Sequence, residues 1–389
     1  MTRVAREGIP QAMIITKILT TAEEVSALRP AWAALLAENP AANRPFFSWE
    51  WFEASVHAFA GEASRYVIVL EEHGQTIGIL PLLRRKTRQY GMALYELTFC
   101  PNFNTPRNDL LVSASPHEGA ASRAVWDALL ADQGAWHVLR LDNLPCDSPL
   151  SNLLVETEAA GTGLVIRSAG LRSPCVGIGD FESFDDYFMA TVKKHHRTNL
   201  RRHLKRLDET GQGWTVDCFD TPDNIARGLE EVFQVRRTSW KGAPAEDFVR
   251  FFQEISPSLA DRREILIAVL RIGGRPVAAQ YFVCKEGEYY LILNDHDHQC
   301  RDTLAPGTNL LTLVLQQAFE RHWKVLDFSG DDYEYKTRLA TSMRSHYCFQ
   351  VFNSGLMSRT AYFGKTRVLP LVRKMFRKNK HQSVAAGGE

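Results

Sequence analysis

The chain has 389 residues, of which 45% are apolar and 23% are charged, and its formal net charge at pH 7 is only +1. This composition is that of an ordinary soluble globular protein, and the balanced charge does not single out nucleic acid or membrane as a partner. The length predicts two or three domains.

Cysteine usage and apolar runs indicate the cellular compartment. Seven cysteines are scattered along the chain without a Cys-x-x-Cys pair, which argues against a zinc ribbon or a disulfide scaffold and favours a reducing environment. No N-terminal segment joins a basic start to a long apolar run, and no stretch reaches about 18 consecutive apolar residues. We therefore expect a cytoplasmic protein without a signal peptide or a transmembrane segment.

The first half of the chain carries the signals of an α/β unit. Thr21 and Glu24 form a capping box that opens a helix through Leu36. Gly74 marks a tight turn between two strands. The elements after the first helix are expected in the order helix, hairpin, strand, helix and strand, at residues 49–59, 66–70 with 76–80, 108–112, 119–131 and 136–141.

The second half repeats this order. Thr221 and Pro222 open a helix to about Trp240, and a further helix follows at 247–255. A second glycine turn, at Gly274, then joins strands at 265–270 and 276–280. The repeated order predicts an α/β (α+β) fold with two tandem units, each a mixed, mostly antiparallel sheet flanked by helices.

Three regions follow from this repeat. We expect an N-terminal unit at 1–180, a C-terminal unit at 181–355 and a basic tail at 356–389. Two interpretations of the tail stay open, namely contact with a membrane surface or an acidic partner, and a frayed terminus.

A basic helix, predicted over residues 184–209, leads into the second unit. Leu200, Leu204 and Leu207 recur with helical spacing and mark its apolar face. From residue 193 onward no acid interrupts the opposite face before Asp208, and this face carries Lys193, Lys194, Arg197, Arg201, Arg202, Lys205 and Arg206. These cations are interpreted as a solvated surface, as contacts to cofactor phosphates, or as contacts to an RNA backbone.

The stretch from Glu288 to Lys336 is the most informative part of the sequence. It reads as a strand at 289–293, an acidic turn at 294–297, a loop, the segment Ala305-Pro306-Gly307-Thr308 that opens an apolar helix, and a strand at 324–328. The first N–H groups of a helix have no partner within it and carry partial positive charge. Without a side chain, Gly307 would let a phosphate approach the main chain closely. The candidate anion-binding residues are Pro306, Gly307, Thr308 and Asn309, and the alternative is an ordinary helix start.

At this point the sequence resembles the GNAT (Gcn5-related N-acyltransferase) superfamily. The second half is similar to its CelD-like branch, which is associated with cellulose and exopolysaccharide synthesis, and to the Fem-type aminoacyl transferases, which carry two GNAT-like units. The resemblance covers about residues 45–350 and rests on the order of Arg197-x-x-x-Arg201-Arg202, Pro276-Val277-Ala278-Ala279-Gln280, Asn294-Asp295, Pro306-Gly307, and Asp327-Phe328 leading into Asp331-x-x-x-Tyr335-Lys336.

The sequence departs from the usual GNAT pattern before the pyrophosphate helix. A typical member has an Arg/Gln-x-x-Gly-x-Gly/Ala loop, whereas this chain has one glycine, Gly307, in Leu304-Ala305-Pro306-Gly307-Thr308. The first half has Ser113-Ala114-Ser115-Pro116 at the corresponding place, without a glycine. We therefore expect the first unit to be degenerate and the cofactor to bind the second unit.

The resemblance implies acyl transfer from acetyl-CoA or another acyl-CoA to an amine or hydroxyl. Asp295 is the first candidate for the base, Asp331 the second, Tyr335 the acid for the leaving thiolate, and Lys336 a partner for a carboxylate or phosphate. Gln280, Arg197 and Arg201 are candidate substrate ligands. Each also has a structural alternative, such as a turn aspartate, a packed tyrosine or a surface lysine.

The alternation Asp295-His296-Asp297-His298 does not indicate a metal site. On an extended backbone both aspartates face one way and both histidines the other, so we expect no bound metal.

Three functions stay open on this basis. The first is an acyl-CoA-dependent N- or O-acyltransferase acting on a small polar acceptor, such as a sugar or a polysaccharide precursor. The second is a Fem-type transferase that uses aminoacyl-tRNA. The third is a non-catalytic subunit of an exopolysaccharide system, because a fold does not determine a function.

Overall fold

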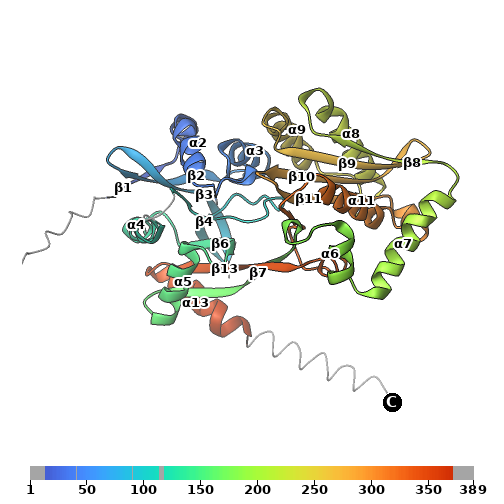
Figure 1. Cartoon of the computed structure of the whole chain (residues 1–389). Helices are drawn as coiled ribbons and strands as arrows, with labels where there is room; N and C mark the ends of the chain where they lie inside the picture. Colours follow the sequence, from blue (N-terminus) through green and yellow to red (C-terminus); the bar gives the residue numbers. More distant parts are fainter. Residues whose placement is uncertain (1–13, 41, 90, 114–117, 371–389) are drawn as a thin grey trace, which may run out of the picture.

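The structure is a computed structural model that describes residues 14–370 except 41, 90 and 114–117. Its first half begins with a strand and three helices and continues with the expected hairpin (Figure 1). The elements are β1 (Ile15–Leu19), α1 (Ala22–Ala27), α2 (Arg29–Glu38), the 3-10 turn η1 (Pro45–Phe47), α3 (Trp49–Phe59), β2 (Ser64–Glu72), β3 (Gln75–Gln89), β4 (Met92–Thr98), β5 (Leu111–Val112), α4 (Glu118–Ala131), β6 (Val138–Pro145), α5 (Pro149–Ala160) and β7 (Leu164–Gly177).

The second half has the same order of strand, helices, three strands, helix and strand. Its elements are the turn η2 (Ile178–Asp180), α6 (Phe184–Thr191), α7 (Lys194–Glu209), β8 (Trp214–Phe219), α8 (Pro222–Thr238), α9 (Glu246–Asp261), β9 (Ile265–Ile272), β10 (Arg275–Lys285), β11 (Glu288–His296), the turn η3 (His298–Cys300), α10 (Arg301–Leu304), α11 (Pro306–Glu320), β12 (Val325–Asp327), α12 (Glu334–Thr337), β13 (Ser342–Phe352), α13 (Leu356–Phe363) and a π-helical turn η4 (Gly364–Val368). The predicted tandem α/β units, with mostly antiparallel strands, are confirmed.

The two units share one continuous sheet of 13 strands, in the order β1-β2-β3-β4-β6-β13-β7-β12-β11-β10-β9-β8, with β5 attached to β3. The parallel pairs are β4 with β6 and β11 with β12, and the other pairs are antiparallel. In the second half, α8 and α9 cover one face of the sheet, and α11, α7 and α6 cover the other (Figure 1).

The last strand of the sheet crosses the predicted boundary between the units. β13 lies between β6 and β7, and β7 in turn pairs with β12 of the second unit. The division at residue 180 stays a prediction, and in the structure each half supplies strands to the middle of the sheet. Residues 371–389, which form the end of the predicted basic tail, lie outside the described residues.

A buried cluster also joins the two halves. The indole of Trp51 in α3 meets the ring of Phe251 in α9 edge-on, with ring centroids 5.0 Å apart. Phe46 meets Tyr290 of β11 in the same way at 4.9 Å. Aromatic contacts of this kind stabilise the fold by about 1 kcal/mol beyond the burial of the rings. The two units are therefore packed against each other and are not separate domains joined only by a linker.

Three local expectations differ from the structure. The third strand of the first unit is β4, not 108–112, of which only Leu111–Val112 forms a strand. The helix expected over 184–209 is two helices, because Val192 adopts an extended conformation after α6. The acidic turn expected at 294–297 is mostly strand, since β11 continues through His296.

Within the ranges that the structure describes, no helix combines the length and the apolar composition that crossing a membrane requires.

Candidate active site

The parallel strands β11 and β12 pair over three residues only, from Glu288 opposite Val325 to Tyr290 opposite Asp327. β12 ends there, whereas β11 continues to His296 with β10 on its other side. Alternate main-chain N–H and C=O groups of this continuation point away from β10, toward the side that β12 has left. We call the region between the end of β12 and the continuation of β11 the fork. In the first unit, β4 ends at Thr98, where its pairing with β6 ends.

One face of β11 carries a chain of polar side chains. The side-chain amide of Gln280, which is fully buried on β10, donates to the side-chain oxygen Oδ1 of Asn294 at 3.3 Å. The Asn294 amide donates to the hydroxyl oxygen of Tyr335 at 3.4 Å. The amide oxygen of Gln280 has no hydrogen-bond partner in the structure. The chain therefore ends at a buried acceptor on one side and at the free O–H of Tyr335 on the other.

The opposite face of β11 holds Asp295, which is 1% exposed. Its carboxylate contacts Lys241 Nζ at 2.7 Å and the Arg236 guanidinium, from α8, at 3.2 Å. Two cations thus occupy the oxygens of the residue expected to act as the base. Asp297 pairs with Arg275, and His296 lies against Gly307 of α11, whereas His298 belongs to the turn η3, so the extended backbone on which the alternation was predicted ends at His296. Among the described residues, no group of three or more His, Cys, Asp or Glu side chains could hold a metal ion.

Lys336 lies at the base of the fork and is 8% exposed. Its Nζ donates to the carbonyl oxygens of Phe328 at 3.0 Å and Ser329 at 2.6 Å. The left-handed conformations of Ser329 (φ 49°) and Gly330 (φ 61°) bend the chain here. Burial lowers the pKa of Lys336 to about 8, although the nearby carboxylates of Asp327 and Asp331 oppose that shift. An ammonium has three N–H donors, so one stays available to a ligand.

Burial also raises the pKa of the Tyr335 hydroxyl, which keeps it protonated at neutral pH. Its ring is 40% exposed and stacks with that of Tyr333, which is 59% exposed, with 6.3 Å between centroids. Both rings lie about 6 Å from Lys336 Nζ. Tyr335 and Lys336 therefore lie together, and their catalytic roles stay predictions, whereas Asp331 is exposed and reaches Lys336 only through its charge.

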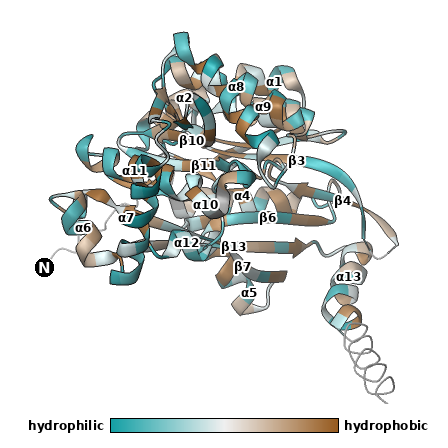
Figure 2. Cartoon of the chain, turned by 90° about the vertical axis from the view of Figure 1, so that its right-hand side faces the viewer, coloured by the Kyte–Doolittle hydropathy of each residue, from teal (hydrophilic) through white to brown (hydrophobic). Residues whose placement is uncertain are grey.

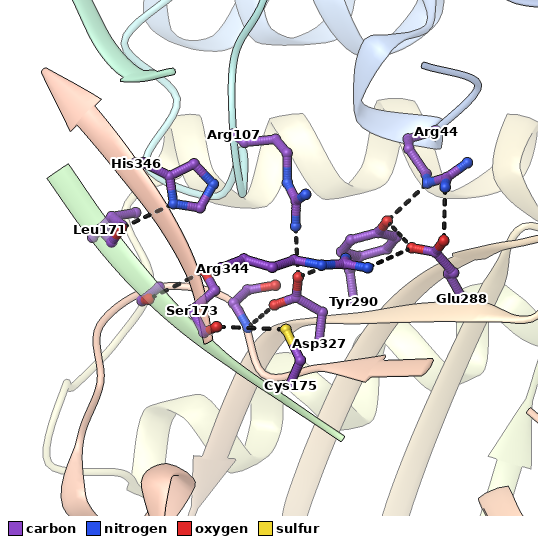
Figure 3. A network of polar contacts seen from close by, with 12 residues as sticks. Arg44, Arg107, Leu171, Ser173, Cys175, Glu288, Tyr290, Asp327, Arg344 and His346 are labelled. Atoms are coloured by element: carbon purple, nitrogen blue, oxygen red, sulfur yellow. Dashed lines mark hydrogen bonds and ion pairs between the residues drawn. The ribbon is translucent and has the colours of Figure 1, made fainter. Parts of the chain in front are cut away.

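Below the fork, Asp327 belongs to a network of arginines and acids between the two units (Figure 3). Asp327 is fully buried and accepts from Arg107 Nη2 at 2.6 Å and from Arg344 Nη1 at 3.1 Å. Arg44 and Arg344 also contact Glu288, at 2.7 Å and 3.2 Å. Sequence analysis did not identify Arg44, Arg107 or Arg344, because no local pattern shows which distant carboxylate an arginine will meet.

The predicted anion-binding residues lie at the start of α11, beside the fork. Ala305 precedes the helix in the left-handed conformation, with φ 45°. A side chain on Gly307 would stand 2.9 Å from His296 Nδ1, so the imidazole already occupies that side of the glycine. The buried Asn309 amide donates to the carbonyl oxygens of Leu304 at 2.8 Å and His203 at 3.2 Å. Close packing therefore accounts for part of this motif, and its role in binding a cofactor stays a prediction.

The basic helix α7 lies against this helix start. Arg206 Nη1 donates to the carbonyl oxygen of Thr303 at 3.3 Å, next to the Asn309–His203 contact. His196 lies near the N-terminal end of α7. Its pKa is lowered, mainly by partial burial and to a lesser extent by the charge of Arg338, which follows α12. In Figure 2, α7 is largely hydrophilic and lies beside α11 and α6. The exposed cations of this region are Lys193, Lys194, Arg201, Arg202 and Lys205.

Two predicted substrate ligands have structural partners instead. Arg197 donates to the carbonyl oxygens of Val192 at 2.5 Å and Met189 at 3.1 Å, which closes the C-terminal end of α6. The guanidinium of Arg201 lies 5.7 Å from the ring centre of Phe188. Their contact with a substrate stays a prediction. The helix start of the first unit, at 113–116, lies largely outside the described residues.

Comparison with known proteins identifies the second unit. Residues 194–337, which contain the fork, match the family described as "Acetyltransferase (GNAT) domain". No curated protein matches the sequence.

Solved structures share the fold over most of the chain. FemX has a TM-score of 0.55 at 12% identity, covering 86% of this chain and 98% of its own. A protein of unknown function from Bacteroides thetaiotaomicron has a TM-score of 0.52 at 11% identity, covering 87% of this chain and 100% of its own. The C-terminal domain of a protein assigned as a lysylphosphatidylglycerol synthetase from Agrobacterium fabrum has a TM-score of 0.51 at 14% identity, covering 86% and 94%. Residues 194–337 are therefore similar to the GNAT domain family, and the chain as a whole shares the fold of FemX over most of its length.

Proposed function

We propose that the chain transfers an acyl group from a thioester to an amine or hydroxyl of a small polar acceptor, and that the reaction takes place in the fork. The observation that carries this proposal is the end of the β11–β12 pairing after three residues, with Lys336 at the base of the fork and Tyr335 and Asn294 beside it. Main-chain N–H groups along the free edge of β11 would donate to the thioester carbonyl oxygen, whose negative charge grows in the transition state.

Lys336 is the group best placed to take the proton of the acceptor. Its two hydrogen bonds to carbonyl oxygens use both N–H groups of the neutral amine, which leaves the lone pair for the acceptor. With a pKa of about 8, a substantial fraction of the amine is neutral near physiological pH. Asp295, whose oxygens contact Lys241 and Arg236, would hold Lys241 in place rather than act as the base.

Tyr335 would supply the proton for the leaving group. The acceptor nitrogen or oxygen bonds to the carbonyl carbon, the carbon–sulfur bond breaks, and the thiolate takes the phenolic proton. Asn294 donates to the Tyr335 oxygen and so leaves the O–H free for this step. The proton gained by Lys336 returns to the phenolate through solvent, which closes the cycle without a covalent enzyme intermediate.

The donor that fits this arrangement is acetyl-CoA or another acyl-CoA. The start of α11 and the cations of α7 lie side by side next to the fork, where the phosphates of such a donor would need positive charge. The exposed rings of Tyr333 and Tyr335 offer flat apolar faces at the opening, which suits a sugar or a polysaccharide precursor as the acceptor.

Calorimetric titration of the full chain with acetyl-CoA and longer acyl-CoA thioesters tests the donor. We expect binding to the wild type and to Lys336→Met, since the substitution removes proton transfer and leaves the α11 start intact. Release of free thiol, followed with a panel of amines and amino sugars, should fall in two variants, Lys336→Met and Tyr335→Phe. If no thioester binds the folded protein, the acyl-CoA donor is wrong. If both substitutions leave the biological function unchanged, the fold is a non-catalytic scaffold.

The alternative donor is an aminoacyl-tRNA, favoured by the exposed cations along α7 and by the fold shared with FemX. This donor predicts binding that weakens steeply with salt, with a slope of about −0.7 to −0.9 per neutralised phosphate in a plot of log affinity against log salt concentration. Substituting Arg202 and Lys205 by glutamine should reduce that slope by about two. Absence of binding, or binding that does not depend on salt, would exclude this donor.

A further inference from the structure

The carboxylate of Asp327 links the first unit to the base of the fork. One of its oxygens accepts from Arg107 Nη2 at 2.6 Å, and Arg107 belongs to the loop between β4 and β5 of the first unit (Figure 3). Its other oxygen accepts the main-chain N–H of Ser329 at 2.8 Å. The Asp327 side chain is fully buried, and that of Arg107 is only 14% exposed. A carboxylate in such a place is costly unless cations and donors surround it.

The same turn holds Lys336. Ser329 donates its main-chain N–H to Asp327 and uses its own carbonyl oxygen to accept from Lys336 Nζ at 2.6 Å. The N–H of Phe328 donates to Pro174 in the first half at 2.9 Å, and its carbonyl oxygen is the second acceptor for Lys336. An unbroken series of contacts therefore runs from Arg107 through Asp327 and the turn at Ser329 to Lys336.

We propose that Arg107 is a positioning residue for Lys336, so that the first unit completes the active site of the second. Arg107 neutralises Asp327 and holds it against the turn whose carbonyl oxygens orient the lysine. That Lys336 is catalytic rests on the proposed function, whereas the link from Arg107 to Lys336 rests on the contacts alone. This assigns a task to the first unit, which the sequence predicts to be degenerate.

The charges around Lys336 give the sign of the expected effect. Asp327 and Asp331 favour its protonated form, Lys241 disfavours it, and the rings of Tyr333 and Tyr335 lie beside it. Arg107 and Arg344 offset the charge of Asp327. Without Arg107 the potential at Lys336 becomes more negative, so its pKa should move up toward that of an ordinary lysine.

The test is Arg107→Met in the full chain, with the reactivity of Lys336 as the readout. Trace labelling with acetic anhydride across a pH series, followed by mass spectrometry of the peptide, reports the neutral fraction of this amine without any turnover. A rise of about one pKa unit from about 8 would slow labelling at pH 8 about fivefold. Arg107→Lys keeps the charge and should give a smaller shift, and it serves if Arg107→Met does not fold.

Arg85→Met is the matched control. Arg85 contacts Glu96, whose side chain is 2% exposed. Gln89 is a second donor to this carboxylate, at 3.3 Å, in the same way that Arg344 is a second donor to Asp327. Its removal leaves an equally buried carboxylate inside the first unit, away from the turn. We expect it to lower stability without changing the labelling of Lys336.

The outcomes separate the two proposals. If folded Arg107→Met labels as the wild type does, or if Arg85→Met shifts Lys336 equally, the positioning role is overturned. If the wild type binds and transfers no acyl group but Arg107→Met still slows the labelling, the positioning role stands and the proposed function fails. Where transfer is measurable, the rate should rise with pH as Lys336 loses its proton, and Lys336→Met should abolish this rise. Arg107→Met should shift the rise to higher pH. It should also lower kcat with little effect on the KM for the donor.

Discussion

Replacing Lys336 by methionine should change how stability depends on pH. The folded protein lowers the pKa of this amine from 10.5 to about 8. Between these values the unfolded chain binds more protons than the folded one, so stability rises with pH in this window. A shift of about 2.5 units corresponds to about 3 kcal/mol, because each unit is worth about 1.4 kcal/mol. The free energy of unfolding of the wild type should therefore rise by about 2 kcal/mol more than that of Lys336→Met between about pH 7 and about pH 9.5.

Urea denaturation of both proteins across this range measures the effect as the difference between their free energies of unfolding. The variant also leaves the carbonyl oxygens of Phe328 and Ser329 without this donor, which costs about 1–3 kcal/mol at every pH and does not alter the slope. Lys205→Met is the control, because its side chain is 76% exposed, and its difference curve should be flat. If the stability curves of the wild type and Lys336→Met are parallel, Lys336 does not have the lowered pKa on which the mechanism depends.

Further predictions concern the helix start, the proton donor and the shared sheet. Gly307→Ala should cost about 1–3 kcal/mol in denaturation and weaken acyl-CoA binding, because the new methyl group would stand 2.9 Å from His296 Nδ1, whereas Gly119→Ala, with open space around it, should not destabilise. Tyr335→Phe should lower kcat about a hundredfold or more and Tyr333→Phe much less, a ranking that equal rates would contradict. Residues 181–389 expressed alone should not fold, because β12 and β13 then lose their partner β7, and co-expression with 1–180 should restore solubility and a cooperative unfolding transition. A cooperative fold of the second half alone would contradict the last prediction.

The sequence predicts those parts of the fold that depend on neighbouring residues. The glycine turns at Gly74 and Gly274, both with φ 77°, and the capping box at Thr21 are local features, and the structure confirms them. The third strand of the first unit escaped prediction because β4 alternates exposed Ala93 and Tyr95 with buried residues, one of which, Glu96, is charged and pairs with Arg85 of β3. A half-solvated strand of this kind lacks the apolar run by which strands are recognised.

The candidate site follows the same rule. Residue types and their order are visible in the sequence, which is why Tyr335 and Lys336 are candidate site residues. The sequence cannot give partners that lie far along the chain, so the pairing of Asp295 with Lys241 and the use of Arg197 to close α6 appear only in the structure. In both cases a charge expected to face a ligand is already compensated within the protein.

The exchange of strands explains why the two units cannot be assigned separate tasks. β13 follows the segment of Tyr335 and Lys336 in the chain, yet it lies between β6 and β7, and Arg344 near its start contacts Asp327 at the base of the fork. The carboxylate that shapes the Lys336 turn is therefore held by one arginine from each half of the chain. A first unit could lose its own ligand site and still be retained, because the second unit needs its strands to close the sheet and its Arg107 to neutralise Asp327. Loss of cofactor-binding features in the first unit is thus compatible with a strong constraint on its fold.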